Sequence, residues 1–372
     1  MRLTPAETAH VQTRLHAATD DQSALVRFLQ PWWNASMAAV PSWVAPNVLT
    51  VLGSLCVLVP TALALWWSPT LTDPLPRWLI ALQILGVFGF QTLDALDGKQ
   101  ARRTGSSSPL GSWLDHSLDI ATIQLMLLGV VASMQAGFGA LAWAWLAICV
   151  TNNYLLHWES SHTGTLILSN GSSITDVQVS AMALHAVALV SSTIYPTTIG
   201  ALLPATAGGI GSDLTVAAVV MIFSVVVIGS IAAAGSIVRV LRSDVPRRES
   251  LRRLVSIFVI VVPGTAAIVA VDDIAVQVVV GAGTLLLGVR SVGRIVLENL
   301  LRRVPVTVDV GIVFAALLPL VVLLPDIALE TAAGLFMLAA FAFMWFFVDT
   351  ARSLAVVLGE SVFVLSKPKS TT

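Results

Sequence analysis

Apolar runs of about twenty residues recur along most of the chain, and no other feature restricts its fold as strongly. Wound as a helix, a run of this length spans the ~30 Å hydrocarbon core of a bilayer. Hydrophobic residues make up 56% of the 372 residues, and the mean hydropathy is +0.87. The chain is therefore expected to be an all-α, polytopic membrane protein with one membrane domain, although its length alone would suggest two or three soluble domains.

About ten transmembrane helices are predicted. Their expected positions are residues 47–67, 76–97, 110–135, 138–157, 177–195, 213–238, 254–271, 274–292, 306–324 and 328–350. Residues 1–22 are expected to form a polar tail without regular structure. Residues 23–37 are expected to form a short helix in the membrane interface, because their aromatic side chains suit the headgroup level.

Lysine and arginine are distributed unevenly across these spans. If the spans place both termini on one side, 19 of the 20 Lys and Arg residues fall on that side and only Arg77 falls opposite. The opposite side instead carries Asp272, Asp273, Asp326 and Glu330. Because positive charge is enriched on the cytosolic side of membrane proteins, both termini are expected in the cytosol.

Four carboxylates lie within 26 residues, although charged residues make up only 11% of the chain. Asp94 and Asp97 lie three residues apart in the second span, and Asp115 and Asp119 lie four apart in the third. Each pair therefore shares a helical face. Antiparallel spans bring both pairs to a similar depth, just inside the cytosolic face, if the third helix begins with Ser108 as its cap and Pro109 in first position. Placing ionisable groups in a membrane costs free energy, so a functional site is expected here.

Carboxylates at one depth repel one another unless a cation lies between them. Hard oxygen ligands favour Mg²⁺, Mn²⁺ or Ca²⁺, and a pair of Mg²⁺ or Mn²⁺ ions is expected. Gly98 and Ala101 leave room for a ligand, and Arg102 offers a guanidinium to a phosphate oxygen. This combination favours phosphoryl transfer. A cation transporter is the alternative from another class, but it leaves these three residues and Gly111 unexplained.

The spacing of these residues also matches a family signature. From Asp94 to Asp119 the chain reads D-x2-D-G-x2-A-R-x8-G-x3-D-x3-D, which resembles the signature of the CDP-alcohol phosphotransferases, the class-I CDP-alcohol phosphatidyltransferase family. The resemblance implies a membrane enzyme that moves a phospho-alcohol from a CDP-linked donor to a second alcohol and releases CMP. It further implies that the four aspartates bind metal ions. The CDP moiety would be accommodated at Asn47, Gly98, Ala101, Arg102 and Gly111.

Further segments resemble the choline/ethanolamine phosphotransferase branch of this family. They are residues 41–50, 97–104, 108–111, 115–116, 158–166 and 175–178. This branch implies CDP-choline or CDP-ethanolamine as donor, diacylglycerol as acceptor, and phosphatidylcholine or phosphatidylethanolamine with CMP as products. The alternative within the family is another substrate pair, such as CDP-diacylglycerol with inositol. The resemblance also implies an endoplasmic reticulum or Golgi membrane, contact with membrane lipids, a homodimer and no nucleic-acid partner.

The resemblance leaves two groups open as the general base, His116 and Asp119. The branch commonly has a glutamate one turn before the histidine, where this chain has Ser112. Such a carboxylate would orient the imidazole and raise its basicity. Asp176 is one acid that would replace it. Asp176 and Glu159 are also predicted to contact the substrate.

Other side chains are candidates for the headgroup end of the substrate. His157 and His162 flank Glu159, and an aromatic cage for a quaternary ammonium would draw on Trp113, Tyr154 and Trp158. By this interpretation, residues 1–40 form a cytosolic tail and interfacial helix, and residues 41–200 form the catalytic helices. Residues 201–355 add further transmembrane helices to the same membrane domain, and residues 356–372 form a cytosolic tail.

Overall fold

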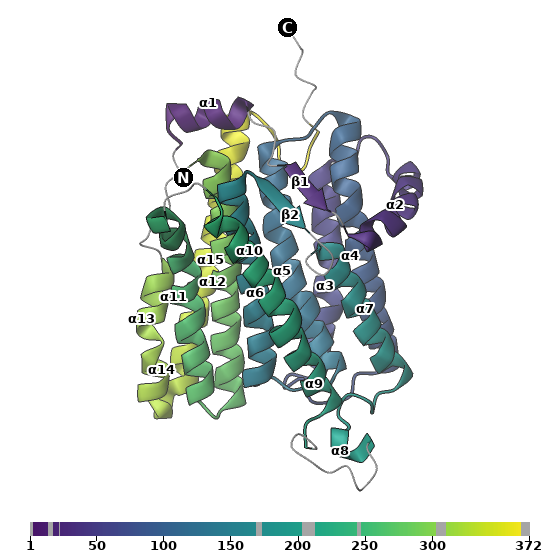
Figure 1. Ribbon diagram of the computed structural model, residues 1–372, viewed down its shortest axis with the longest axis vertical. Helices are drawn as coiled ribbons and strands as arrows, with labels where there is room; N and C mark the ends of the chain where they lie inside the picture. The colour runs from purple at the N-terminus through teal and green to yellow at the C-terminus, as the bar shows by residue number, and fades with distance from the viewer. Residues whose placement is uncertain are drawn as a thin grey trace.

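The computed structural model describes residues 3–13, 18–21, 23–168, 173–202, 213–243, 247–302 and 310–365. These residues form a bundle of long helices that share one axis (Figure 1). The strands described are two short segments, which confirms the predicted all-α class. The last residues of the predicted C-terminal tail, 366–372, lie outside the described part of the chain.

The first half of the bundle supplies the helices that carry the conspicuous aspartates. Its elements are α3 (Pro46–Trp67), α4 (Arg77–Thr104), α5 (Pro109–Ser133), α6 (Ala140–Thr163), α7 (Ile174–Val190) and the single turn α8 (Ile199–Leu202). Proline begins both α3 and α5, where its fixed φ suits the first helical position. The α8 turn lies at the end of the bundle opposite α1 (Pro5–Thr13) (Figure 1).

The second half of the bundle contains helices of more varied length. Its elements are α9 (Val216–Phe223), the π-helical η3 (Ser224–Gly229), α10 (Ser230–Leu241), α11 (Arg247–Ala270), α12 (Ile274–Leu301), α13 (Val310–Leu317), α14 (Pro319–Leu323), the 3₁₀ turn η4 (Pro325–Ile327) and α15 (Ala328–Leu358). Together with the first half, they place a helical segment at each of the ten predicted spans.

Seven helical segments are long and apolar enough to cross a membrane, namely α3, α4, α5, the α9–α10 segment, α11, α12 and α15. The apolar helices α7 and α13–α14 are shorter. The helix α6 is 24 residues long but more polar, because it carries Asn152, Asn153, His157 and Glu159 among its apolar residues. The described helices are thus those of a polytopic integral membrane protein.

The N-terminal region is more ordered than the sequence predicts. Both α1 and the strand β1 (Ala18–Asp21) lie in the segment expected to be an unstructured tail, so that expectation is wrong for their residues. The strand pairs in parallel with β2 (Thr165–Leu168), and Val11 of α1 is buried in a cluster with residues of α12 and α15. Long-range partners of this kind leave little trace in a local polar composition.

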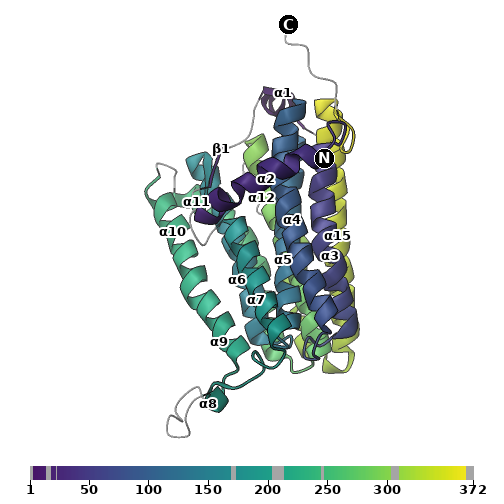
Figure 2. The same cartoon turned by 90° about the vertical axis from the view of Figure 1, so that its right-hand side faces the viewer.

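The short helix α2 (Ala24–Ser36) forms where the interfacial helix is predicted. Ser23 caps it by accepting a hydrogen bond from the Leu25 N–H at 3.1 Å. Figure 2 shows α2 crossing the outside of the bundle beside α4. Lys99 and Arg103 of α4 hold it there through hydrogen bonds to Asn34 and to the Met37 carbonyl.

The central position in the bundle belongs to α5, which packs against α3, α6, α7 and α12 (Figure 1). Of its most apolar stretch 72% is buried, against 17% for α15. The outer helices expose large apolar side chains such as Phe258, Phe341 and Trp345, as a lipid-facing surface requires. Of the carboxylates that α5 contributes to the acidic stretch, Asp119 is therefore buried among other helices, whereas Asp115 stays 27% exposed.

Candidate active site

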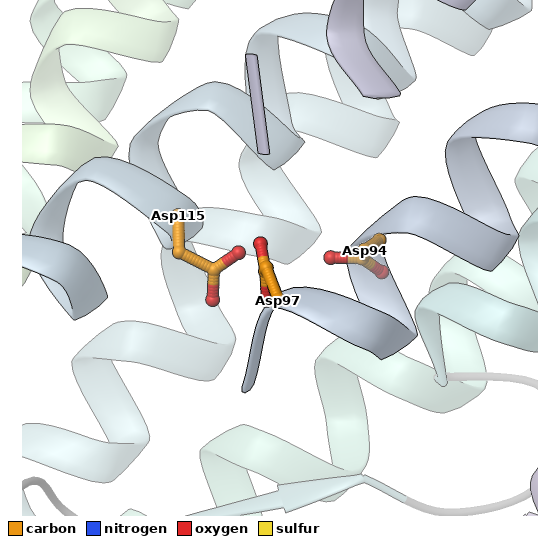
Figure 3. Close-up of side chains that lie close together, drawn as sticks. All are labelled: Asp94, Asp97 and Asp115. Carbon is orange, nitrogen blue, oxygen red and sulfur yellow. The ribbon is translucent and has the colours of Figure 1, made fainter. Parts of the chain in front are cut away.

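Three aspartates from two helices meet near the end of the bundle that carries α1, β1 and β2. Asp94 and Asp97 come from α4 and Asp115 comes from α5, and one carboxylate oxygen of each lies within 4.8 Å of the other two (Figure 3). Oxygens on opposite sides of a Mg²⁺ ion are about 4.2 Å apart, because each Mg–O bond is about 2.1 Å. The three carboxylates are thus spaced so that a shared cation could bridge them.

The turn between α4 and α5 aligns these residues. Gly105 ends α4 with a φ of 64°, in the left-handed region that favours glycine. Ser108 then accepts a hydrogen bond from the Gly111 N–H at 3.2 Å, and Pro109 begins α5. The predicted cap and helix start are both confirmed. Because α4 and α5 are antiparallel and joined by this short turn, residues at similar distances from it lie at the same depth.

The residues present fit a divalent cation. All the donors are carboxylate oxygens, the hard ligands that Mg²⁺ and Mn²⁺ prefer. Oδ1 of Asp115 and Oδ1 of Asp119 are buried and have no hydrogen-bond partner. Buried polar atoms are normally paired, and carboxylates this close repel one another. A bound cation would give the unpaired oxygens a partner and would also neutralise the repulsion.

Asp119 lies beside Asp94 but outside the group of three. The sequence predicts that four aspartates form one centre; the structure gathers three and places the fourth next to them. It also adds Thr50 of α3, which sequence reasoning missed. The Thr50 hydroxyl donates to Oδ2 of Asp97 at 2.5 Å, so the orientation of this carboxylate is fixed by a neighbouring helix.

His116 lies next to Asp115 at the rim of the aspartate group. Its Nδ1 is 3.0 Å from the Ser112 carbonyl oxygen and 3.4 Å from Oδ2 of Asp115. A carbonyl oxygen can only accept, so this hydrogen bond places the hydrogen on Nδ1 and leaves the lone pair of the neutral ring on Nε2. The ring of His157 lies 5.5 Å away between centroids. The acid beside the imidazole is thus Asp115 and not Asp176.

The five positions predicted to accommodate CDP lie at the adjoining ends of α3, α4 and α5. A Cβ atom on Gly98 would stand 3.5 Å from Nη1 of Arg102, an ordinary contact distance, so the guanidinium lies directly beside this glycine. A Cβ atom on Gly111 would stand 3.3 Å from Oδ1 of Asn47. Ala101 is half-buried on α4, between Gly98 and the turn at Gly105.

Two other predicted substrate contacts have partners elsewhere. The Glu159 carboxylate is 1% exposed and is bound by the Arg239 guanidinium of α10, with Nη2 donating to Oε2 at 2.9 Å and Nε donating to Oε1. Oδ1 of Asp176 accepts a hydrogen bond from the Ser23 hydroxyl at 2.5 Å. Neither carboxylate belongs to the group formed by Asp94, Asp97 and Asp115.

The three aromatic residues considered for a cation cage are buried in separate packing contacts. Trp113 is fully buried and its ring lies 5.0 Å from that of Phe347. The polar atom of each of the three aromatic residues has a hydrogen-bond partner. Trp113 Nε1 donates to the Gly293 carbonyl, and Trp158 Nε1 donates to the Ser250 carbonyl. The Tyr154 hydroxyl shares a hydrogen bond with Ser256. His162 binds the Trp158 carbonyl and the Ser250 hydroxyl. These residues therefore form helix contacts in this structure.

Gln178 is a candidate that sequence reasoning did not include among the site residues. It lies near the start of α7, is fully buried, and stands close enough to Asp94 to interact with its carboxylate. Neither of its amide atoms forms a hydrogen bond of standard geometry. Two signals in the sequence mark this position: an amide inside an apolar helix, and its place in the segment 175–178 that resembles the choline/ethanolamine branch.

Comparison with known proteins finds relatives that are named cholinephosphotransferases or choline/ethanolaminephosphotransferases, together with uncharacterised members of the class-I CDP-alcohol phosphatidyltransferase family. The chain is 37% identical over 182 residues to "Cholinephosphotransferase 1" of Gallus gallus, covering 48% of this chain and 52% of the relative. It is 35% identical over 152 residues to "Choline/ethanolaminephosphotransferase 1" of Saccharomyces cerevisiae, covering 41% and 39%. It is also 35% identical over 166 residues to an "Uncharacterized CDP-alcohol phosphatidyltransferase class-I family protein 2" of Dictyostelium discoideum, covering 44% and 40%.

The curated relatives are thus class-I CDP-alcohol phosphatidyltransferase proteins that include choline/ethanolaminephosphotransferases. This confirms the resemblance that the Asp94–Asp119 signature predicts. The chain spans about half the length of the curated relatives it matches, or somewhat less. No family model matches the chain.

Proposed function

We propose that the protein transfers phosphocholine or phosphoethanolamine from CDP-choline or CDP-ethanolamine to diacylglycerol, forming phosphatidylcholine or phosphatidylethanolamine and releasing CMP. The observation that carries the proposal is the meeting of Asp94, Asp97 and Asp115 within 4.8 Å, at the positions of the family signature, in a chain whose relatives are named cholinephosphotransferases. A protein that joins a soluble nucleotide to a lipid needs its site near a membrane surface. The aspartates of α4 support such a position, because they lie in the last turns of this helix, which ends at Thr104.

The proposed reaction makes one bond to phosphorus and breaks one. The diacylglycerol hydroxyl oxygen bonds to the phosphorus that bears the choline or ethanolamine group, and the bond from that phosphorus to the oxygen of CMP breaks. The hydroxyl proton passes to Nε2 of His116 or to the carboxylate of Asp119. The lone pair that the Ser112 contact leaves on Nε2 supports His116, whereas the position of Asp119 beside Asp94, at the edge of the aspartate group, supports Asp119.

The remaining residues would bind and orient the substrates. Asp94, Asp97 and Asp115 would hold one or two Mg²⁺ or Mn²⁺ ions, which when bound neutralise charge on the two phosphates. The Arg102 guanidinium would contact a phosphate oxygen, with space left by Gly98 and Ala101. Asn47 and Gly111 would border the nucleotide. Glu159 and Asp176 stay in the proposal as substrate contacts only if ligand binding releases them from Arg239 and Ser23.

The proposal also includes a membrane orientation. The excess of Lys and Arg on the side of the termini supports a cytosolic active site and cytosolic termini. The family resemblance supports a place in phospholipid synthesis, an endoplasmic reticulum or Golgi membrane, and a homodimer. A reporter fused to the C-terminus that proved lumenal or external would overturn the orientation.

The direct test is a donor comparison with the purified protein in nanodiscs. Labelled CDP-choline, CDP-ethanolamine and CDP-diacylglycerol are supplied in turn, with diacylglycerol or inositol as acceptor and Mg²⁺ or Mn²⁺ present. Label from CDP-choline or CDP-ethanolamine should appear in phospholipid, with stoichiometric CMP. Product from CDP-diacylglycerol and inositol alone would favour the alternative within the family. Cation flux in liposomes without nucleotide, and no transfer, would favour a transporter.

A further inference from the structure

Gln178 occupies the inner face of α7 and faces the aspartate group. Its side chain is fully buried and lies within interaction range of Asp94. Asp176 stands two residues earlier, about 200° around the helix, and its carboxylate accepts a hydrogen bond from Ser23. The two polar residues at the start of α7 therefore point in nearly opposite directions. Only Gln178 is directed towards the aspartate group.

The position of Gln178 is fixed by a hydrogen-bond network at the start of α7. Oδ2 of Asp21 accepts a hydrogen bond from the Ser173 hydroxyl at 2.7 Å, and Oδ1 of Asp21 accepts one from the Ser23 N–H at 2.9 Å. Ser23 in turn donates to Asp176 at 2.5 Å. These contacts join α7 to β1 and α2. The helix that carries Gln178 is thus held in place by polar contacts a few residues before it.

Among the described residues, the amide of Gln178 makes no hydrogen bond of standard geometry, although buried amides are nearly always paired. Leaving such a group unpaired costs free energy, so a side chain that merely filled space at this position would be apolar. Gln178 lies within hydrogen-bonding range of Asp94, so its amide nitrogen is placed to donate to the Asp94 carboxylate once a bound cation orients that carboxylate.

Asp94 has different neighbours from the other two aspartates. Asp97 receives a hydrogen bond from Thr50, and Asp115 has His116 beside it. Asp94 lies beside Asp115, which repels its charge, and within hydrogen-bonding range of Asp119 and Gln178. Residues that bind metal ions are usually oriented by hydrogen bonds from a surrounding layer of residues. In the part of the chain that the structure describes, Gln178 is the side-chain amide placed to donate such a hydrogen bond to Asp94.

We propose that Gln178 is a positioning residue that orients the Asp94 carboxylate as a ligand for the divalent cation. The proposal deepens the proposed function and rests on its metal-binding part. It gives α7, which lies outside the Asp94–Asp119 signature, a direct role at the site. It also links the order of α2 and β1 to cation binding, since both help to fix the start of α7.

The test measures Mn²⁺ binding directly, without nucleotide or lipid acceptor. Purified wild-type protein, Gln178→Met and Asp94→Asn are titrated with Mn²⁺ in nanodiscs, and free Mn²⁺ is followed by electron paramagnetic resonance. Methionine has nearly the size of glutamine but donates no hydrogen bond. Loss of a supporting hydrogen bond typically weakens metal binding about 10- to 100-fold, and this is the loss expected for Gln178→Met. Asp94→Asn should weaken it further.

Gln124→Met is the matched control. Gln124 is a buried amide of α5 whose two polar atoms also lack partners, but its recognised neighbour is the Cys149 thiol and not an aspartate. Its Mn²⁺ affinity should stay within about twofold of wild type, since second-layer effects require contact with a ligand. Melting temperatures of all variants in EDTA show whether each is folded before cation is added.

Steady-state rates separate this role from direct substrate contact. Gln178→Met should need more Mn²⁺ for half-maximal rate, and should regain most of kcat at saturating Mn²⁺, with KM for CDP-choline unchanged. A folded Gln178→Met protein with wild-type Mn²⁺ affinity would overturn the proposal. So would a raised KM for donor or acceptor at unchanged Mn²⁺ affinity. If wild type binds Mn²⁺ but transfers no label, the proposed function fails while the Gln178 titration still stands.

Discussion

Carboxylates occur in two contrasting settings in this bundle. Glu159 of α6 is buried with a partner, the guanidinium of Arg239, which binds both of its oxygens. Asp94, Asp97 and Asp115 gather with one another; Asp97 is buried and the other two are half-buried. Like charges held together repel one another unless a cation lies between them, whereas the charge of Glu159 is balanced by Arg239. The difference supports the proposal that the three aspartates serve the chemistry and that Glu159 serves the packing of the helices.

The largest expected effect comes from Asp97→Asn in the unpaired group. Cation neutralisation of transition-state charge is worth several kcal/mol, and about 1.4 kcal/mol is tenfold in rate, so transfer from CDP-choline should fall roughly 10³-fold. The melting temperature in EDTA should stay level or rise, because the substitution relieves repulsion. Near wild-type activity in this variant would show that Asp97 is not needed for the reaction. An unfolded variant would show that Asp97, like Glu159, stabilises the fold.

His116→Asn should have the next largest effect. A positioned base contributes about 10² to 10⁴ in rate, and the asparagine keeps polarity without a proton-accepting nitrogen. If His116 is the base, wild-type activity falls at acidic pH as the imidazole takes up a proton, and this decline disappears in the variant.

Asp119→Asn provides the counterpart to His116→Asn. If Asp119 is the base, Asp119→Asn loses at least 10²-fold at saturating Mn²⁺, while His116→Asn retains most activity and the wild-type pH profile. Measuring kcat against pH for both variants therefore decides between the two groups.

Removal of the Arg239 partner should affect stability more than chemistry. Arg239→Gln leaves Glu159 buried without its cation, and hydrogen bonds to charged groups are worth about 1.5–3 kcal/mol. Because Arg239 is 38% exposed, solvent reduces the cost, and we expect about 2 kcal/mol or less. Melting in nanodiscs measures it, and the double variant with Glu159→Gln should recover part of the loss. A raised KM for CDP-choline in Glu159→Gln would instead support the substrate contact predicted for Glu159.

Asp176→Asn should have the smallest effect. Asparagine retains an oxygen that accepts from Ser23, so the loss should be about 1 kcal/mol or less, with activity within about twofold of wild type. Ser23→Ala, which removes the donor and the cap of α2, should cost slightly more. An unchanged melting temperature together with a large loss of activity in Asp176→Asn would return this residue to the substrate site.

The sequence by itself determined the parts of the protein that depend on local periodicity. Apolar runs of membrane-spanning length predicted the ten helical segments. Spacings of three and four residues placed Asp94 with Asp97 and Asp115 with Asp119, because the helical period fixes which side chains share a face. Ser108 and Pro109 predicted the start of α5 for the same local reason, and the structure confirms it.

Only the tertiary structure decided how these faces meet. The rotation of each helix against its neighbours determines that three aspartates converge while Asp119 stands beside them. Glu159 is bound by Arg239, eighty residues away in the sequence, and Asp176 accepts a hydrogen bond from Ser23, 153 residues away. Such partners follow from packing over the whole bundle and leave no signal in a local pattern. The same packing turns Asp176 outward and Gln178 inward, so that the less conspicuous residue of the two faces the aspartates.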